Sequence, residues 1–329
     1  MSMPKRQLGA NGPMVSAIGF GCMSFAGFFG AADDETSLET LAAVEAAGID
    51  FWDTANLYGM GRSERIIGQY LKESSAQVTL ATKVGIIPGP PRAFNNEEDY
   101  IRAELESSLE KLNRDKVELY YIHRRQQELP VEKVAETMGK LIEEGLIDAW
   151  GLSEVAPSTI RRAHKVVPVT AVQNEYSLWT RQPELGVIQT CEELGIAFVP
   201  FSPIARGALG VADLDPAAFH DSDFRKSNPR FMGQNWLENM EYIRAFRTYA
   251  AKKGVSTPAL ALAWVLHQGD HLIPIPGTRT KEHLADWADA GEIGLSEDDL
   301  WEIEQILPAG WAAGDRYADA QMVGVERYC

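Results

Sequence analysis

The feature that most constrains the fold of this chain is a regular alternation of short apolar segments with longer amphipathic ones. Short segments rich in β-branched and aromatic residues predict strands, and apolar residues at helical spacing predict helices. Nearly continuous apolar strands that alternate with helices are typical of a parallel sheet covered on both faces. We predict strands at 16–23, 48–55, 78–85, 117–123, 147–153, 170–176, 196–202 and 271–277.

Helical patterns lie between these strands. We predict helices at 34–47, 63–73, 97–113, 131–145, 157–165, 184–194 and 239–267 and around 280–289. A further C-terminal helix at 295–307 starts with Ser296 and Asp299 at the spacing of a capping box. Eight strand–helix units over 329 residues favour an α/β fold of the (β/α)8 TIM-barrel type, in a single domain spanning 1–329. Periodicity leaves a doubly wound sheet open as the alternative.

Two segments fall outside this alternation. The stretch 6–21 carries Asn-Gly between two apolar runs, which predicts a β-hairpin before the first barrel strand. Such a hairpin could close the bottom of the barrel. The stretch 203–238 lacks a clear period and is expected to be a functional loop rather than a domain boundary.

Composition excludes several classes of function. The net charge of −16 is opposite to the basic surface that binding to nucleic acid requires. No run of about 18 or more apolar residues is present to span a membrane, and the N-terminus lacks the pattern of a signal peptide. Cys22, Cys191 and Cys329 are widely spaced, and the histidines are scattered, so we expect a cytoplasmic protein without a metal site.

Polar residues follow three consecutive predicted strands at the point where each strand ends. Asp53 closes the second strand and Tyr58 lies in the loop after it, Lys83 closes the third strand, and His123 closes the fourth. In a (β/α)8 barrel these ends meet at the rim that carries the chemistry. Any one of these residues alone has an ordinary structural explanation, but together they predict a catalytic group.

This group suits the reduction of a carbonyl. The Lys83 ammonium would favour the phenolate of Tyr58 and lower the pKa of the phenol from about 10 toward neutrality. Asp53 would hold Lys83 in its charged form, and His123 could orient a carbonyl oxygen or relay a proton. A phenol tuned in this way can donate a proton as charge develops on that oxygen. No side chain supplies a hydride, so a nicotinamide cofactor is implied.

The sequence resembles the aldo-keto reductases from about residue 6 to residue 310. The segment DTANLYGMGRSE is similar to the family's catalytic-tyrosine signature, LATKVG to its catalytic-lysine strand and YYIHR to its histidine strand. GLSE, VQNEYSLW, FSPIARGALG and IPIPGT follow in family order. The segments DFRKSNPRF and AAGDRYADAQM are similar to the branch that contains pyridoxal reductases, auxin-induced-type reductases and potassium-channel β subunits.

The resemblance implies roles for individual residues. Tyr58 would be the general acid, Asp53 and Lys83 would tune it, and His123 would orient the substrate carbonyl. Ser153 and Gln173 would bind the nicotinamide carboxamide. The implied cofactor is NADPH, with NADH as the alternative, and the residues implied to bind it are Gly21, Met23, Ser153, Gln173, Phe201, Ser202, Pro203, Ile204, Arg206, Gly277, Thr278, Arg279 and His283.

Some positions depart from the family pattern. Relatives commonly have a Glu-Asn pair for adenine where this chain has Asp286 and Trp287, and a glycine where it has Ala205. After His123 the chain reads HRRQQ rather than HRVDP, which removes an acid and adds a cation beside the site. The departures at Trp287 and Ala205 favour an alternative function, a nucleotide-binding sensor or regulatory subunit with slow turnover. Another alternative is an aldolase or isomerase with Lys83 as a Schiff base.

The expected substrate is a small carbonyl compound, most simply a hydrophobic or aromatic aldehyde or ketone. Aromatic residues after the first predicted strand, together with two tryptophans, could line its pocket. These residues are Phe25, Phe28, Phe29, Trp179 and Trp236. Taken singly, each is more often a packing residue. The substrate's identity, the reaction direction and the oligomeric state are left open.

Overall fold

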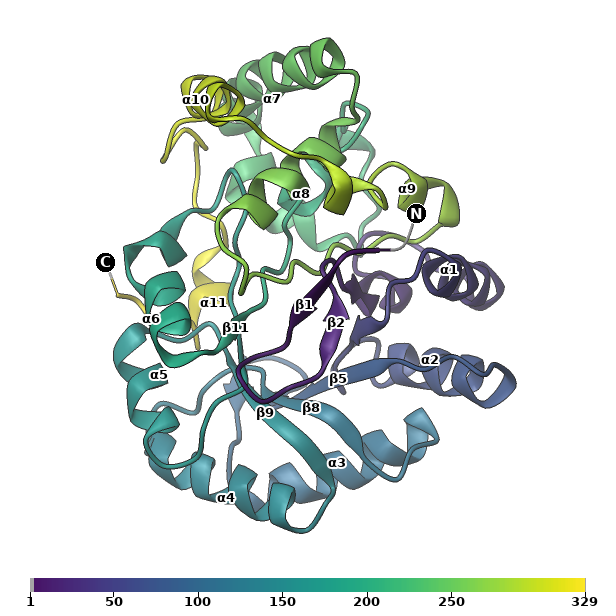
Figure 1. Ribbon diagram of the computed structural model, residues 1–329, viewed down its shortest axis with the longest axis vertical. Coiled ribbons are helices and arrows are strands. Elements are labelled where there is room, and N and C mark those ends of the chain that lie inside the picture. Colours follow the sequence, from purple (N-terminus) through teal and green to yellow (C-terminus); the bar gives the residue numbers. More distant parts are fainter. Residues whose placement is uncertain (1–2, 329) are drawn as a thin grey trace.

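The computed structural model describes residues 3–328 and shows a parallel sheet that curls around a central core, with helices outside it (Figure 1). The order of the strands in this sheet is β11-β10-β9-β8-β5-β4-β3. They are β3 (Phe20–Gly21), β4 (Phe51–Asp53), β5 (Thr79–Val84), β8 (Val117–Ile122), β9 (Ile147–Ser153), β10 (Ala171–Gln173) and β11 (Ala197–Phe198). Every neighbouring pair is parallel, as the alternation of strands and helices predicted.

The segment 271–277 closes the sheet into a barrel. The backbone N–H of Ile273 donates to Phe198 at 2.9 Å, which joins the segment to β11. On its other side, Gly19 and Gly21 donate to the carbonyls of Pro274 and Pro276, both at 2.9 Å. Proline has no N–H to donate, so the predicted eighth strand pairs through isolated bridges instead of a regular ladder. A closed sheet confirms the (β/α)8 barrel and excludes the open, doubly wound alternative.

The predicted N-terminal hairpin is present. Strands β1 (Lys5–Gln7) and β2 (Met14–Ser16) pair antiparallel, and Figure 1 shows them across one end of the barrel. Leu8 and Val15 from the hairpin are fully buried in a cluster with Phe51, Leu119, Tyr121, Val199 and other residues that point into the barrel. The hairpin therefore covers the bottom of the barrel, opposite the end where the strands terminate.

Helices surround the sheet and bury their apolar faces against it. The larger hydrophobic cluster contains Trp52, Tyr120, Trp150 and Phe198, together with residues from the inner faces of the helices. These helices are α1 (Asp34–Ala46), α2 (Arg62–Glu73), α3 (Glu98–Leu112), α4 (Val131–Glu143), α5 (Pro157–His164), α6 (Val187–Leu194), α7 (Gly233–Lys253), α8 (Thr257–His267), α9 (Lys281–Ala285), α10 (Glu297–Ile306) and α11 (Asp319–Met322).

The helical pattern at 239–267 is two helices rather than one. Helix α7 ends at Gly254, which adopts a left-handed conformation with φ of 71°. Helix α8 then begins with Ser256, whose hydroxyl accepts from the backbone of Ala259 at 3.1 Å. The continuous apolar pattern hid this break because α8 is buried on all sides. The predicted helix at 295–307 is confirmed as α10, including its capping box of Ser296 and Asp299.

Short elements shape the open end of the barrel. Strands β6 (Ile86–Ile87) and β7 (Ala93–Phe94) form a second hairpin directly after β5, which the sequence did not predict. The segment 203–232 consists of loops and 3-10 turns, so the irregular stretch expected at 203–238 ends where α7 begins. The turns are η1 (Cys22–Ala26), η2 (Gln182–Leu185), η3 (Ala205–Gly207), η4 (Pro216–Ala218), η5 (Phe224–Ser227), η6 (Pro229–Phe231) and η7 (Ala290–Glu292). Among the described helices, none combines the length and the apolar character needed to cross a bilayer.

Candidate active site

A cavity of about 540 Å³ opens at the end of the barrel where the strands terminate. Asp53 is the last residue of β4, Lys83 lies one residue before the end of β5, and His123 directly follows β8. Tyr58 is in the loop after β4, where the carbonyl of Lys83 accepts from the backbone of Asn56 at 3.2 Å. The cavity is lined by Asp53, Tyr58 and His123, while Lys83 lies behind them with none of its surface exposed.

Lys83 forms a buried ion pair with Asp53. Its ammonium also donates to the backbone carbonyl of Thr54 at 2.6 Å and lies 3.5 Å from the hydroxyl oxygen of Tyr58. The second oxygen of Asp53 accepts from the side-chain amide of Gln173 at 2.8 Å. Burial favours the neutral amine, but the Asp53 and Tyr58 oxygens raise the pKa of Lys83 above its ordinary value. Lys83 is therefore a fixed positive charge beside the phenol.

The pKa of Tyr58 is shifted in the direction opposite to the one we expected. We expected Lys83 to lower it, yet burial of the phenol raises the pKa above 10, and the nearby charge of Lys83 offsets only part of this effect. The physical reason is that removal from water penalises the phenolate more than one ammonium at 3.5 Å stabilises it. Tyr58 is consequently protonated at neutral pH, which is the form that can donate a proton.

His123 packs against Tyr58, with ring centroids 5.7 Å apart and ring planes at 82°. Burial lowers the pKa of His123 well below its ordinary value, and the charges of Arg124, Lys83 and Arg92 lower it further. The imidazole is thus neutral at pH 7. Its Nδ1 atom is buried and has no hydrogen-bond partner among residues 3–328. This ring nitrogen is therefore available for a hydrogen bond with a ligand.

The residues that the resemblance implied for a dinucleotide all line the same cavity. Ser153 ends β9 and Gln173 ends β10, so both side chains reach the rim beside Asp53. Each is already engaged: Gln173 donates to Asp53, and the hydroxyl of Ser153 accepts from Arg124 at 3.0 Å. The wall contains Gly21, Met23, Ser153, Gln173, Phe201, Ser202, Pro203, Ile204, Arg206, Gly277, Thr278, Arg279 and His283.

The charge of the cavity wall suits an anionic cofactor. Although the chain carries a net charge of −16, its cavity presents more arginines than carboxylates. The arginines of the wall are Arg92, Arg124, Arg206, Arg225 and Arg279, and its carboxylates are Asp53 and Asp286. Arg206 and Arg225 pair with Glu175 and Asp223, which do not line the cavity, so part of this positive charge is neutralised. Ser202, Ala205 and Arg206 have φ between 52° and 56°, a left-handed backbone of the kind that turns N–H groups toward bound anions. The residues present therefore fit a phosphate-bearing dinucleotide.

The far end of the cavity differs from the family pattern in a specific way. Trp287 is only 1% exposed and packs in the hydrophobic core, although it borders the cavity. Asp286 lies 3.2 Å from the Nδ1 atom of His283, and Arg279 donates to the backbone carbonyl of Ala31 at 3.2 Å. Trp287 therefore offers no amide to a ligand here, and the polar residues that line the cavity beside it include Asp286, His283 and Arg279.

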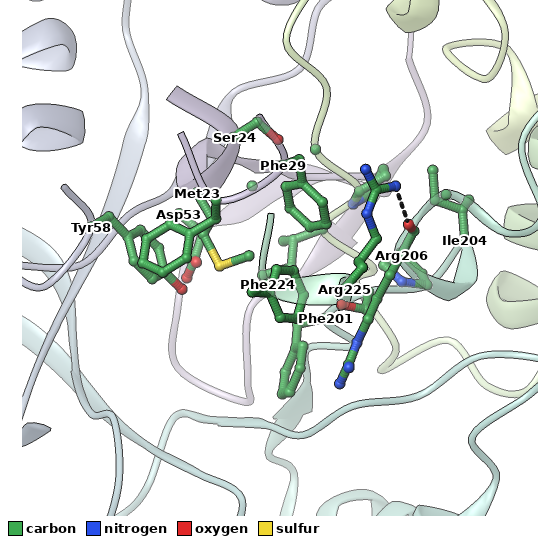
Figure 2. Close-up of a pocket in the computed structure, with 18 of the residues that line it drawn as sticks. Met23, Ser24, Phe29, Asp53, Tyr58, Phe201, Ile204, Arg206, Phe224 and Arg225 are labelled. Atoms are coloured by element: carbon green, nitrogen blue, oxygen red, sulfur yellow. Dashed lines mark hydrogen bonds between the residues drawn. The ribbon is translucent and has the colours of Figure 1, made fainter. Parts of the chain in front are cut away.

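Two of the five aromatic residues expected around the substrate line the cavity. Figure 2 shows Phe29 with Phe201 and Phe224 between Tyr58 on one side and Arg206 and Arg225 on the other. Phe28 packs edge-on against Tyr58, with ring centroids 6.0 Å apart. The other three do not line the cavity, which corrects the expectation: Phe25 is buried in the core beside Phe20, and Trp179 and Trp236 pack on Phe231.

Several cavity residues were missed by the sequence analysis. They come from the loop after β4, the β6–β7 hairpin, the loop after β8, the turn η5 and the C-terminal segment. They are Leu57, Ile86, Ile87, Pro88, Arg92, Arg124, Phe224, Arg225, Tyr317 and Gln321. The signal for Arg124 was its place directly after His123. Tyr317 lies in the segment AAGDRYADAQM, but nothing local indicates that it reaches the cavity: its ring lies 4.4 Å from the Arg206 guanidinium, a contact between residues far apart in the chain.

Comparisons with known proteins agree with this geometry. The sequence model of the Aldo/keto reductase family matches residues 17–308. The chain is 38% identical over 325 residues to aldo-keto reductase yakc (NADP(+)) of Schizosaccharomyces pombe, covering 96% of this chain and 95% of that protein. It is 39% identical over 316 residues to probable aldo-keto reductase 1 of Glycine max, covering 94% and 91% of the two chains.

Solved structures show the same architecture. A glycerol dehydrogenase from Gluconobacter oxydans superposes with a TM-score of 0.86 at 25% identity, covering 97% of this chain and 99% of that one. An aldo-keto reductase from Bacillus halodurans, in its holo form, has a TM-score of 0.77 at 25% identity, with 94% and 97% covered. The family match spans most of the sequence, and both relatives align along nearly their full length. The chain belongs to the aldo/keto reductase family.

Proposed function

We propose that the protein is an NADPH-dependent oxidoreductase that reduces the carbonyl of an aldehyde or ketone to an alcohol, with Tyr58 as the general acid. The observation that carries this proposal is the buried ion pair of Lys83 and Asp53 directly behind the cavity-facing phenol. Burying a charge pair costs free energy, so a buried ammonium held beside a hydroxyl that faces the cavity favours a catalytic role.

The side chains can supply the proton that reduction of a carbonyl requires. Tyr58 is protonated because burial raises the pKa of its phenol, so its hydroxyl can donate to a carbonyl oxygen in the cavity. As the proton leaves, negative charge forms on the phenol oxygen, 3.5 Å from the Lys83 ammonium. Asp53 holds that ammonium in place. His123 is neutral because burial lowers its pKa, so it can donate one hydrogen bond to orient the carbonyl oxygen.

The cofactor supplies the hydride when it is bound. Ser153 and Gln173 lie at the rim where they can contact its nicotinamide carboxamide, and Phe201 offers a ring face for stacking. Arg206 and the left-handed backbone around it suit the pyrophosphate. Arg279 lies at the far end for a 2′-phosphate. The choice of NADPH is supported by these arginines and by the relative from S. pombe, whose name carries NADP(+).

The substrate class is supported by the walls near Tyr58. Phe28 lies against the phenol, and Leu57, Ile86, Ile87 and Pro88 add apolar surface to the same cavity. Apolar walls with a few convergent polar groups are typical of sites for small organic molecules. An aldehyde or ketone with a hydrophobic or aromatic body fits this lining. The solved relative named as a glycerol dehydrogenase acts on an alcohol, the product side of the same reaction class.

The test combines binding and turnover. Fluorescence titration of the purified chain with NADPH and NADH measures cofactor affinity, and nicotinamide absorbance then follows reduction of a panel of aldehydes and ketones. Tight NADPH binding with turnover supports the proposal. Tight binding without turnover across the panel would favour a nucleotide-sensing subunit. A stable Lys83 adduct, trapped with borohydride and substrate, would instead indicate Schiff-base chemistry.

A further inference from the structure

Two arginines face the catalytic end of the cavity without a carboxylate partner. Arg124 is only 4% exposed, and its guanidinium donates to the carbonyl of His123 at 2.6 Å and to Ser153 at 3.0 Å. Its Nε atom has no hydrogen-bond partner within residues 3–328. Arg92 is half-buried, its Nε atom is likewise unpartnered in the described part of the chain, and its guanidinium forms no salt bridge there. Both guanidiniums are always charged.

Two other cavity arginines, Arg206 and Arg225, both labelled in Figure 2, are neutralised. Arg206 pairs with the buried Glu175 at 2.8 Å, and Arg225 pairs with Asp223 at 2.6 Å. Arg125, the cation that the sequence adds after His123, pairs with Glu326 and does not line the cavity. The uncompensated positive charge at the catalytic end therefore belongs to Arg92 and Arg124.

Two nearby carboxylates, Asp53 and Glu154, already pair with other cations. Asp53 pairs with Lys83, and Glu154 accepts from Arg316 in a buried ion pair. Burial is the largest cause of the lowered pKa of Arg92; the charge of Arg124 lowers it further, and Tyr317 and Glu154 offset part of this effect. Burial also lowers the pKa of His123, and the charges of both guanidiniums add to that shift. The two guanidiniums thus lie close enough to repel each other and to act on the catalytic imidazole.

Backbone and side-chain hydrogen bonds fix the segments that carry the two arginines. Arg92 belongs to the β6–β7 hairpin, and Arg124 to the loop after β8. Asn96, just after the hairpin, accepts from the backbone of Gln126 at 2.7 Å, and the Gln126 side chain accepts from the backbone of Asn96 at 2.9 Å. The Asn96 amide also donates to the carbonyl of Arg124 at 3.2 Å. The backbone segments that carry the two arginines are therefore tied to each other by hydrogen bonds.

We propose that the substrate carries a carboxylate, which Arg92 and Arg124 bind while the carbonyl oxygen faces Tyr58 and His123. This inference rests on the proposed function and narrows its substrate class to aldehyde or keto acids with an apolar body. Guanidiniums with free N–H groups bind carboxylates through strong, charge-assisted hydrogen bonds, and Arg124 is already fixed by its bonds to His123 and Ser153. The apolar residues Ile86, Ile87 and Phe28 would contact the part of the substrate between its two polar ends.

The test uses two aldehydes of the same shape, para-carboxybenzaldehyde and its neutral methyl ester, each with saturating NADPH. We expect kcat/KM for the acid to exceed that for the ester by about tenfold or more, as one charged hydrogen-bonding interaction would give. We also expect this ratio to fall with added salt, because salt screens charge attraction at an open cavity. An ester reduced as well as or better than the acid overturns the inference but leaves the proposed function intact.

Variants of Arg92 separate charge recognition from packing. Arg92→Gln should lower the acid-to-ester ratio of kcat/KM about tenfold, and Arg92→Lys should retain most of it. Arg65→Gln is the matched control, because Arg65 is exposed on α2, does not line the cavity and carries the same charge. It should leave the ratio unchanged. An equal change of the ratio in Arg65→Gln and Arg92→Gln would refute the assignment.

The affinity for NADPH distinguishes a substrate-binding role of Arg92 from a cofactor-binding role. Arg92→Gln should leave the Kd of NADPH within about twofold of the wild type, because Arg92 lies at the substrate end. If NADPH binding weakens as much as the reduction of the acid, Arg92 serves the cofactor and the inference fails. If no member of the aldehyde and ketone panel is reduced with either nicotinamide, the proposed function fails and this inference fails with it.

Discussion

The ammonium of Lys83 lies 3.5 Å from the hydroxyl oxygen of Tyr58, and both groups are buried at the end of the barrel where the strands terminate. Burial alone would keep the phenol protonated and make its phenolate costly. The ammonium reduces that cost only when negative charge forms on the oxygen. The pair therefore favours a phenol that holds its proton in the resting state and releases it during reaction.

Tyr58→Phe tests the general acid directly. Because the substitution removes the hydroxyl and retains the ring against Phe28 and His123, we expect kcat for carbonyl reduction to fall ~10²–10⁴-fold. NADPH affinity, measured by fluorescence titration, should change little. Turnover at the wild-type rate would remove Tyr58 from the mechanism.

The Asp53–Lys83 pair predicts a double-mutant pattern in stability. Lys83→Met leaves the Asp53 carboxylate buried without its cation, and we expect a loss of ~3–5 kcal/mol in the free energy of unfolding. Lys83→Met combined with Asp53→Asn should recover part of that loss, because no uncompensated charge remains. Urea unfolding measures both variants. Activity should not return in the double variant, and recovered turnover would contradict the role of Lys83.

The pKa directions predict the pH profile of kcat/KM. Reduction needs protonated Tyr58, whose raised pKa moves the loss of activity at high pH above the ordinary value of 10. It also needs neutral His123, whose lowered pKa moves the loss at low pH well below 6.5. We therefore expect a flat profile between these two values, measured with a substrate that does not titrate in this range. A fall centred near neutral pH would mean that another group controls the reaction.

Arg279 tests the choice of cofactor. We expect Arg279→Ala to weaken NADPH binding more than NADH binding, because only NADPH carries the additional 2′-phosphate. Fluorescence titrations with both nucleotides give the two Kd values. His283→Ala is a useful comparison at the same end of the cavity. Equal weakening of both nucleotides by Arg279→Ala would remove the basis for a preference for NADPH.

Arg316 anchors the C-terminal segment that brings Tyr317 to the cavity. It pairs with Glu154 and lies 3.0 Å from Glu175, both of which are buried. Arg316→Leu should cost ~3–5 kcal/mol of unfolding free energy, because Glu154 is left without its cation. Arg162→Leu, which breaks an exposed pair with Glu132, is the control and should change the urea midpoint much less. Equal midpoints for the two variants would contradict this account.

Sequence by itself determined the barrel and the positions of the catalytic candidates. Apolar periodicity identified each strand of the sheet, and a polar residue directly after such a run must lie at the strand end, as Asp53 and His123 do. The hairpin at the bottom of the barrel followed from Asn-Gly, whose backbone preference is local. These features were predictable because they depend on neighbours within a few residues.

Tertiary structure decided what depends on distant parts of the chain. Phe25, Trp179 and Trp236 pack in the core instead of lining the cavity, because aromatic side chains take whichever buried contacts the assembled barrel offers. The pKa of Tyr58 rises rather than falls, because its direction is the balance of burial against the charge of Lys83. Arg92 and Arg124 are uncompensated only because the nearby carboxylates pair elsewhere in the fold. Burial and charge pairing are sums over residues from many segments, which local sequence patterns do not contain.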